Sequence, residues 1–201
     1  MSEHSLCSSS SYDTENSPLS APSSGSCKVK YRADSNWDFF LDAARKPVDL
    51  SLILPHYRAR YQPVDHRMNM YVGCGDEPVK LKICRSYPRS HFFLEVHGSA
   101  SDVTVWIPSD FKGNIQHTGK ATYSAGFINR VMQNVRFNAI YEETKNEDCV
   151  VIDTRGHITF RMWDAHTGAP ECVQKEAFKR IFGCSKKAPE TTIDWDFLLD
   201  G

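Results

Sequence analysis

Histidine and carboxylate side chains that could bind a metal ion or transfer protons are spread over the middle of the chain. His91, Glu95 and His97 occupy alternate positions of one predicted strand and are expected to point outward together. Two imidazoles six residues apart on a strand lie about 20 Å from each other, too far to bind one metal ion. We interpret these side chains as the solvated face of a strand and predict no metal site.

An enzyme would require several other groups to converge in one pocket, namely His97, Asp102, His117, Asp153 and His157. The chain has no GxSxG, HExxH, Walker or EF-hand motif. The Gly73–Asp76 segment is interpreted as a turn, because it lacks the lysine and helix start of a phosphate-binding loop. Cys149 precedes an apolar strand and is expected to pack rather than react. The sequence therefore predicts no catalytic residue and no cofactor. An enzyme of unknown reaction remains an alternative, which the structure tests by showing whether these five side chains converge.

Tryptophan side chains offer a second kind of chemistry, stacking on a ligand. Trp106 and Trp163 fall on the predicted outer face of their strands, near Thr104, Thr159 and Arg161. Aromatic faces with polar flanks can stack on a sugar ring or anchor a protein partner. We favour the alternative that a helix or the terminal segment covers both indoles and forms a second core.

An acidic, aromatic motif occurs near both ends of the chain. Residues 37–42 read Trp-Asp-Phe-Phe-Leu-Asp, and residues 195–200 read Trp-Asp-Phe-Leu-Leu-Asp. The candidate contact residues are Trp37, Phe40, Trp195, Phe197 and Leu199. Both copies either bind a partner or cover edges of the protein's own sheet, and we favour covering because an exposed apolar cluster is costly. The second copy also alternates strictly, so it could add to a sheet as a strand.

Alternation of apolar and polar residues predicts the elements that position these side chains. Leu94, Val105 and Phe160 are expected to share one dry interior, with Trp106 and Trp163 facing away from it. Further strands are predicted at residues 48–54, 69–72, 79–83, 114–117, 121–123, 135–137 and 150–152, and helices at 35–45, 127–135 and 173–182. The fold class is mainly β, either a single antiparallel sandwich or a short solenoid-like domain with peripheral short helices.

Length and composition suit one soluble domain with tails. In 201 residues, 24 Lys and Arg balance 25 Asp and Glu, so no net field favours nucleic acid. No apolar run is long enough for a membrane span, and no secretory signal precedes the domain. Seven cysteines match no disulfide or zinc framework, which indicates reduced thiols in the cytoplasm or nucleus. We predict a disordered Ser-rich tail at 1–28, a β-rich domain at 36–183, and a linker with the acidic-aromatic segment at 184–201.

Three motifs carry a family resemblance: Val103-Thr104-Val105-Trp106-Ile107-Pro108, Phe127-Ile128-Asn129-Arg130 and Phe160-Arg161-Met162-Trp163-Asp164. The chain resembles an uncharacterised family of intracellular fungal proteins, mostly from mushroom-forming fungi, classed as a domain of unknown function. The similarity spans roughly residues 50–170 and implies a compact β-rich domain with variable tails. A weaker similarity, in strand and turn rhythm only, is to the β-solenoid domains of bacterial adhesins.

The function that these observations favour is a non-catalytic intracellular module that binds another protein through the Trp-Asp-Phe segments or the outer tryptophans. The alternative is carbohydrate binding by the face of Trp106 and Trp163.

Overall fold

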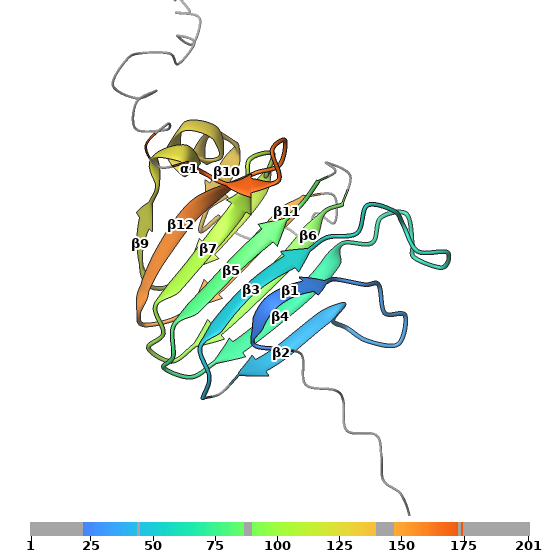
Figure 1. The fold of residues 1–201 in the computed structure, drawn as a ribbon, viewed down its shortest axis with the longest axis horizontal. Helices are drawn as coiled ribbons and strands as arrows, with labels where there is room; N and C mark the ends of the chain where they lie inside the picture. The colour runs from blue at the N-terminus through green and yellow to red at the C-terminus, as the bar shows by residue number, and fades with distance from the viewer. Residues whose placement is uncertain (1–21, 44, 87–89, 140–146, 173, 175–201) are drawn as a thin grey trace, which may run out of the picture.

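The computed structural model describes residues 22–43, 45–86, 90–139, 147–172 and 174. Two β-sheets face each other across one core, and a short helix lies at one end of them (Figure 1). The strands are β1 (Ser24–Lys28), β2 (Phe39–Ala43), β3 (Val48–Ile53), β4 (Met68–Cys74), β5 (Val79–Cys84), β6 (Phe92–Gly98), β7 (Val103–Pro108), β8 (Gly113–His117), β9 (Lys120–Tyr123), β10 (Val135–Phe137), β11 (Asp148–Asp153), β12 (His157–Asp164) and β13 (Ala169–Pro170). The helices are α1 (Ala125–Arg130) and the 3-10 turn η1 (Met132–Asn134).

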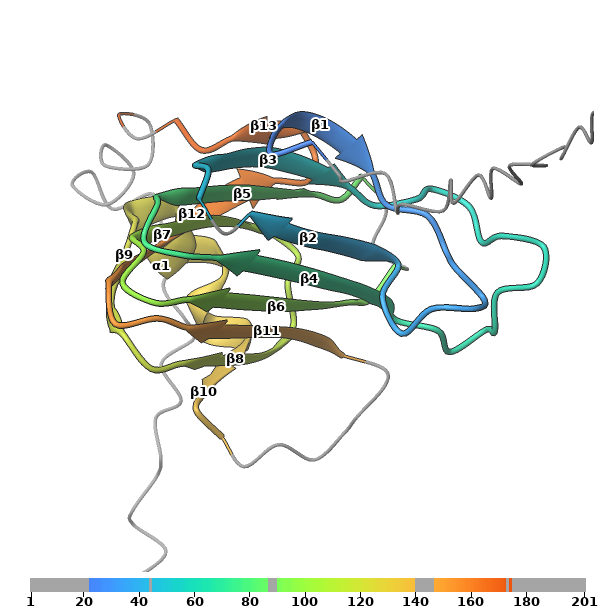
Figure 2. The same ribbon diagram turned by 90° about the horizontal axis from the view of Figure 1, so that it is seen from below.

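Successive strands alternate between the two sheets as far as β10. The first sheet has the order β1-β3-β5-β7-β12-β13, with β9 also paired to β12. The second sheet has the order β10-β8-β11-β6-β4-β2, which Figure 2 shows from its outer side. Each coil of the chain thus supplies one strand to each sheet, which is the winding of a β-solenoid.

The strand directions correct the prediction of an antiparallel sandwich. Among the described residues, every strand pair is parallel except the short pair of β12 and β13. The turn at residues 99–102 carries the chain from β6 to the opposite sheet, so β6 and β7 are not paired. Strands buried on both faces are typical of parallel sheets, whereas these sheets bury one face only. Their sequences therefore alternate as antiparallel strands do, and the pattern cannot distinguish the two arrangements.

The last complete coil is inserted between two earlier ones. Strand β11 pairs with both β6 and β8, and β12 pairs with both β7 and β9. The chain passes from β7 to β8 while leaving one position open in each sheet, and later returns to fill both. The pairing of β8 with β11 and that of β9 with β12 therefore join residues more than thirty positions apart, whereas β8 also pairs with the nearer β10 on its other side.

A buried ion pair fixes the start of the inserted coil. Asp148 accepts a hydrogen bond from Arg85 Nη1 at 2.9 Å and one from the Phe92 amide at 3.3 Å. Arg85 also donates to Asp110, and both Arg85 and Asp148 are buried. Gly113 lies against the same point with φ +153°, where a Cβ would come 1.9 Å from the Asp148 carbonyl oxygen. The close approach of β8 to β11 therefore requires glycine here.

The core consists of the inward residues of both sheets. Leu94, Val105 and Phe160 are fully buried in one cluster, as predicted. Burial of such a side chain contributes about 1.5–3 kcal/mol each. Helix α1, which overlaps the first part of the predicted 127–135 helix, adds Phe127, whose ring lies 5.6 Å from that of Phe160. Ser124 caps this helix by accepting the amide of Phe127.

The helix predicted at residues 35–45 is wrong, because this segment contains strand β2. Phe39, Leu41 and Ala43 face the core, and β2 pairs in parallel with β4. Short apolar segments satisfy helical and strand spacing alike, so pairing decides. Asp38 is buried at the entry to β2 and accepts the amides of Arg32 and Asn69 at 2.9 and 2.8 Å.

The structure describes only part of the two ends of the chain. Ser24–Lys28 lie inside the predicted Ser-rich tail and form β1, so this part of the tail is a strand. Residues 1–21 of that tail, the predicted helix at 173–182 apart from Gln174, and the second Trp-Asp-Phe copy lie outside the described residues. No helix in the described part is long and apolar enough to cross a membrane.

Candidate functional site

Four aromatic side chains gather on the outer face of the second sheet. Trp37, Phe40, Tyr71 and Phe93 form this aromatic cluster, contributed by β2, the residues before it, β4 and β6. The Phe40 and Tyr71 rings stack 5.0 Å apart at 9°, in the register that pairs β2 with β4. Trp37 lies 5.3 Å from Tyr71 and 6.1 Å from Phe93. Phe40 is 49% exposed, so the cluster presents an open aromatic edge to solvent.

An arginine covers the far side of the cluster. The guanidinium carbon of Arg67 lies 4.9 Å from the centroid of the Phe93 ring, a cation–π contact. Cys149 occupies the neighbouring position on β11, opposite Phe93, and is buried. Burial raises the pKa of Cys149 to about 11, and the Arg67 charge opposes that rise. The thiol is therefore protonated near neutral pH, in agreement with its predicted packing role.

A hollow lies beside the cluster, over Gly73 of β4. It has a volume of ≈ 340 Å³ and is lined by Asp42, Tyr71, Gly73, Cys74, Gly75, His97, Gly98 and Ser99. Along this row of the sheet Asp42 pairs with Gly73, and Gly73 pairs with His97. The glycine has no side chain between Asp42 and His97, and the Tyr71 ring lies 3.2 Å from the position that its Cβ would take. We call this depression the Gly73 hollow.

Carboxylates surround the hollow. Burial raises the pKa of Tyr71, and the negative charges of Asp42 and Glu95 raise it further. Asp42 is exposed and makes no hydrogen bond or ion pair within the part of the chain that the structure describes. These carboxylates therefore make the electrostatic potential at the Tyr71 hydroxyl more negative.

The histidines and carboxylates predicted as possible catalytic groups converge only in part. His97 Nε2 lies 2.5 Å from Glu95 Oε1, and His97 Nδ1 lies 3.8 Å from Asp153 Oδ2. Asp102 instead accepts the His157 amide at 2.9 Å, and His157 Nε2 lies 2.9 Å from the Thr122 hydroxyl. His117 lies near Phe160 and Phe137. Within the described residues, no three His, Cys, Asp or Glu side chains gather that could hold a metal ion.

The outer face of the first sheet carries Trp106 and Trp163, as expected from the strand pattern. Lys82 and Arg161 flank Trp106 on the neighbouring strands, with their charged groups 5.4 and 5.3 Å from its ring centroid. Trp106 is only 8% exposed, whereas Trp163 is half-buried opposite Pro108 and Pro170. The two indoles therefore do not form one open platform.

Arg161, which lies over Trp106, also forms an ion pair with Glu171. Arg161 Nε donates to Glu171 Oε1 at 3.2 Å, and the Glu171 side chain is buried. The Trp106 indole nitrogen and Glu171 Oε2 are buried without a hydrogen-bond partner among the described residues. These groups belong to the packing of this face.

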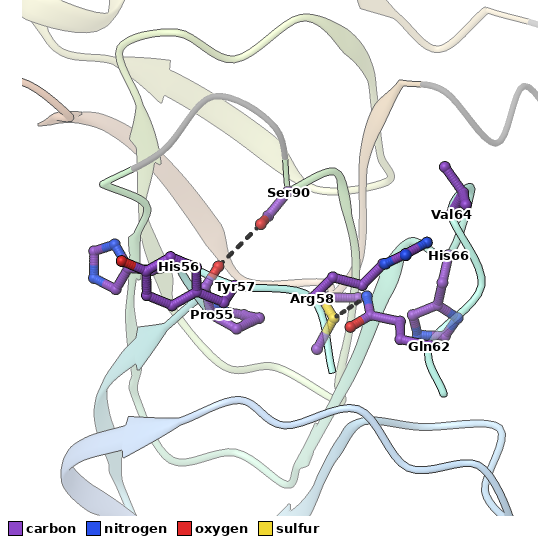
Figure 3. Close-up of a pocket in the computed structure, with 9 residues that line it drawn as sticks. Pro55, His56, Tyr57, Arg58, Gln62, Val64, His66 and Ser90 are labelled. Carbon is purple, nitrogen blue, oxygen red and sulfur yellow. Dashed lines mark hydrogen bonds between the residues drawn. The ribbon is translucent and has the colours of Figure 1, made fainter. Parts of the chain in front are cut away.

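A larger cavity of ≈ 660 Å³ lies under the connection from β3 to β4 (Figure 3). Ser90 donates to the Pro55 carbonyl at 3.0 Å on one side of it, and Gln62 contacts Met68 on the other. Its wall residues Tyr57 and Val64 are 89% and 87% exposed. These two side chains therefore have few contacts with the rest of the protein, and the polar groups of Gln62 and His66 are already engaged by Met68 and Asp38. We regard the aromatic cluster and the Gly73 hollow as the stronger site.

The site includes residues that the sequence reasoning missed. Trp37 and Phe40 were predicted as contact residues, but Tyr71, Phe93 and Gly73 were not. The signal was available in part, because Phe93 and Tyr71 occupy outward positions of alternating strands. Their proximity to Phe40 follows only from the parallel register. Trp195, Phe197 and Leu199 lie outside the described residues.

Comparison with known protein families places most of the chain in a family model. The sequence model of a family described as Domain of unknown function (DUF7330) matches residues 17–165, which includes every strand from β1 to β12. Neither the curated proteins nor the solved structures contain a match to the chain.

Proposed function

The chain belongs to the family described as Domain of unknown function (DUF7330), and from this premise we propose that it is a non-catalytic module that binds another protein. The binding surface is the aromatic cluster of Trp37, Phe40, Tyr71 and Phe93. The observation that carries the proposal is the 49% exposure of Phe40, which stacks on Tyr71 beside Trp37 and Phe93, with Trp37 in contact with both Tyr71 and Phe93. Aromatic residues in a preformed group are the side chains that most often dominate protein interfaces.

The cluster suits binding because the sheet already holds its side chains in place before a partner binds. Tyr71 and Phe93 stand on adjacent parallel strands, and Trp37 lies against both. A partner that covers the rings would not have to order them, so little side-chain entropy is lost. The rim carries Asp42 and Glu95 on one side and Arg67 on the other, which supplies polar contacts around an apolar centre.

Peptide display tests this proposal without a known partner. A phage-displayed library of random peptides is selected on the immobilised full chain, and enriched clones are then bound to variants. Phe40→Ala is expected to weaken them by about tenfold or more, because an interface anchor is lost. Ile128→Ala on α1 removes another exposed apolar residue and serves as the matched control. Equal binding of both variants, or no enriched clone, would refute the proposal.

Carbohydrate binding by Trp106 and Trp163 is the second candidate. Its support is the outward position of both indoles beside Thr159 and Arg161. The low exposure of Trp106 weighs against it. A saturable change in tryptophan fluorescence with a panel of neutral oligosaccharides, lost in Trp163→Ala, would transfer the role to this face.

The proposed setting is the cytoplasm or nucleus of a fungal cell. Cys27, Cys74, Cys84, Cys149 and Cys172 are all unpaired, as expected in a reducing compartment. The fungal origin rests on the resemblance of the three sequence motifs.

A further inference from the structure

The Gly73 hollow has a composition that selects the charge of its ligand. Carboxylates of Asp42, Glu95 and Asp153 stand on three strands around it or next to it. Two nearby cations are already engaged: Arg67 lies over Phe93, and Arg155 donates to the Ser99 carbonyl at 3.1 Å. The hollow therefore lies in a negative part of a protein whose net charge is only −1.

Two side-chain oxygens that can accept hydrogen bonds lie at the edge of the hollow, on Asp42 and Tyr71. A Cβ at Gly73 would lie 3.3 Å from the Tyr71 hydroxyl and 3.4 Å from Asp42 Oδ1. Both oxygens thus lie close to the position that a Gly73 side chain would take. Asp42 lacks a partner in the described part of the chain, whereas Glu95 is engaged by His97. A group with several N–H donors and no acceptor matches this set best, and a guanidinium is such a group.

Aromatic side chains favour the same ligand. The Tyr71 ring borders the hollow, and Phe40 and Trp37 continue the aromatic surface beyond it. This protein already places guanidinium groups over rings, at Arg67 and Phe93 and at Arg161 and Trp106. Among the described residues no cation lies over Tyr71. Planar guanidinium groups combine stacking on rings with hydrogen bonds to carboxylates, which an ammonium does less well.

We propose that the Gly73 hollow binds an arginine side chain of the protein partner, held by Asp42 and the Tyr71 hydroxyl beside the aromatic cluster. This inference rests on the proposed function and names the partner's chemistry: an arginine next to an apolar residue that covers Phe40. Packing against the aromatic cluster supplies most of the contact area, and pairing of Asp42 with the arginine selects partners that carry this residue.

A titration followed by NMR tests the hollow directly. The ¹⁵N-labelled full chain is titrated with acetyl-Gly-Arg-Gly-amide, and the Gly73, Gly75 and Gly98 amides are expected to shift with saturation. The same peptide with citrulline keeps the shape and removes the charge, so it is expected to leave them unmoved. Equal shifts with both peptides would overturn the proposal.

Two variants remove the shape and the charge separately. Gly73→Ala places a methyl in the gap at 3.2 Å from Tyr71 and is expected to weaken the arginine peptide by about tenfold. Asp42→Asn keeps the shape and is expected to weaken it by about two- to fivefold, as for one exposed charge pair. Asp34→Asn, an exposed carboxylate on a loop, is the matched control and is expected to bind as wild type. Wild-type affinity in both hollow variants would overturn the proposal even if one of them folded poorly.

The outcomes separate this inference from the proposed function. Peptides selected by display that depend on Phe40 but lack arginine, together with no shift by the arginine peptide, would reject the hollow and keep the protein-binding role. A glucosamine tetramer that shifts the same amides at lower concentration than the arginine peptide would reject the peptide ligand and indicate an amino sugar.

Discussion

The two outer faces of the solenoid use tryptophan in opposite ways. On the first sheet, Trp106 stands in one row with Lys82 and Arg161, and the two cations cover its ring. On the second sheet, Trp37 lies against Tyr71 and Phe93, with Phe40 open to solvent. On the first sheet the tryptophan ring is covered by the protein's own cations, whereas on the second sheet aromatic surface is exposed to solvent and can contact a partner.

The neighbours in the row explain the difference. In a parallel stack each outward residue meets residues of adjacent coils at the same height, so a cation beside an aromatic ring covers it. The first face carries Lys80, Lys82, Lys120 and Arg161, and the second carries Asp42, Glu95 and Asp153 near its rings. Strands of the same geometry therefore form two different outer faces. On the first, cations cover the ring of Trp106, and on the second, carboxylates lie near an exposed aromatic cluster. Exposure of a tryptophan depends on the charge of its neighbours one coil away.

The largest expected contrast is in stability. Trp106→Ala removes a buried aromatic side chain and is expected to lower the free energy of unfolding by about 3–5 kcal/mol. Phe40→Ala removes an exposed ring and is expected to cost at most about 1 kcal/mol. Urea denaturation of the full chain measures both. Equal losses would show that the two faces are packed alike and would break the comparison.

An alkaline pH series compares a buried thiol from each face. Burial raises the pKa of Cys84 and of Cys149 from 9.0 to about 11. The folded state thus keeps these protons to higher pH than the unfolded state, so their stabilisation is complete below about pH 9 and is lost as pH rises toward 11. The free energy of unfolding is expected to fall over this window. Cys149→Ala is expected to fall less steeply, and an unchanged slope would contradict the assignment.

The smallest expected effect concerns the cation that covers Trp106. Lys82→Met removes the ring contact and the 2.8 Å ion pair with Asp49, with an expected loss of about 0.5–1 kcal/mol. Asp49→Asn removes only the ion pair and is expected to cost less. Chemical denaturation of the two variants side by side separates the contributions. A greater loss in Asp49→Asn would show that the ion pair, and not the ring contact, holds Lys82.

Parts of the fold could be predicted from local pattern. Alternation correctly identified which residues of β5, β6, β7 and β12 face the core, including Leu94, Val105 and Phe160. It failed at β2, where Trp37, Phe40, Leu41 and Ala44 have helical spacing as well. It also favoured an antiparallel sandwich equally with a solenoid, because both bury one face of each strand.

The candidate site was predicted only at its sequence-local members. Trp37 and Phe40 were recognised from a repeated motif within one segment. Tyr71, Phe93 and Gly73 come from two other strands, and only the pairing of β2, β4 and β6 brings them together. The inserted position of β11 and β12 was equally beyond local pattern, since it depends on pairing between segments far apart in the chain.

By itself the sequence determined which side of most strands is apolar, because side-chain alternation is a property of the strand alone. The tertiary structure decided which strands are neighbours, and with that which rings stack, which are covered by cations and where a glycine opens a hollow. The physical reason is that inward burial is set residue by residue, whereas the chemistry of an outer face is set by register between coils. That register is selected by the packing of the whole core.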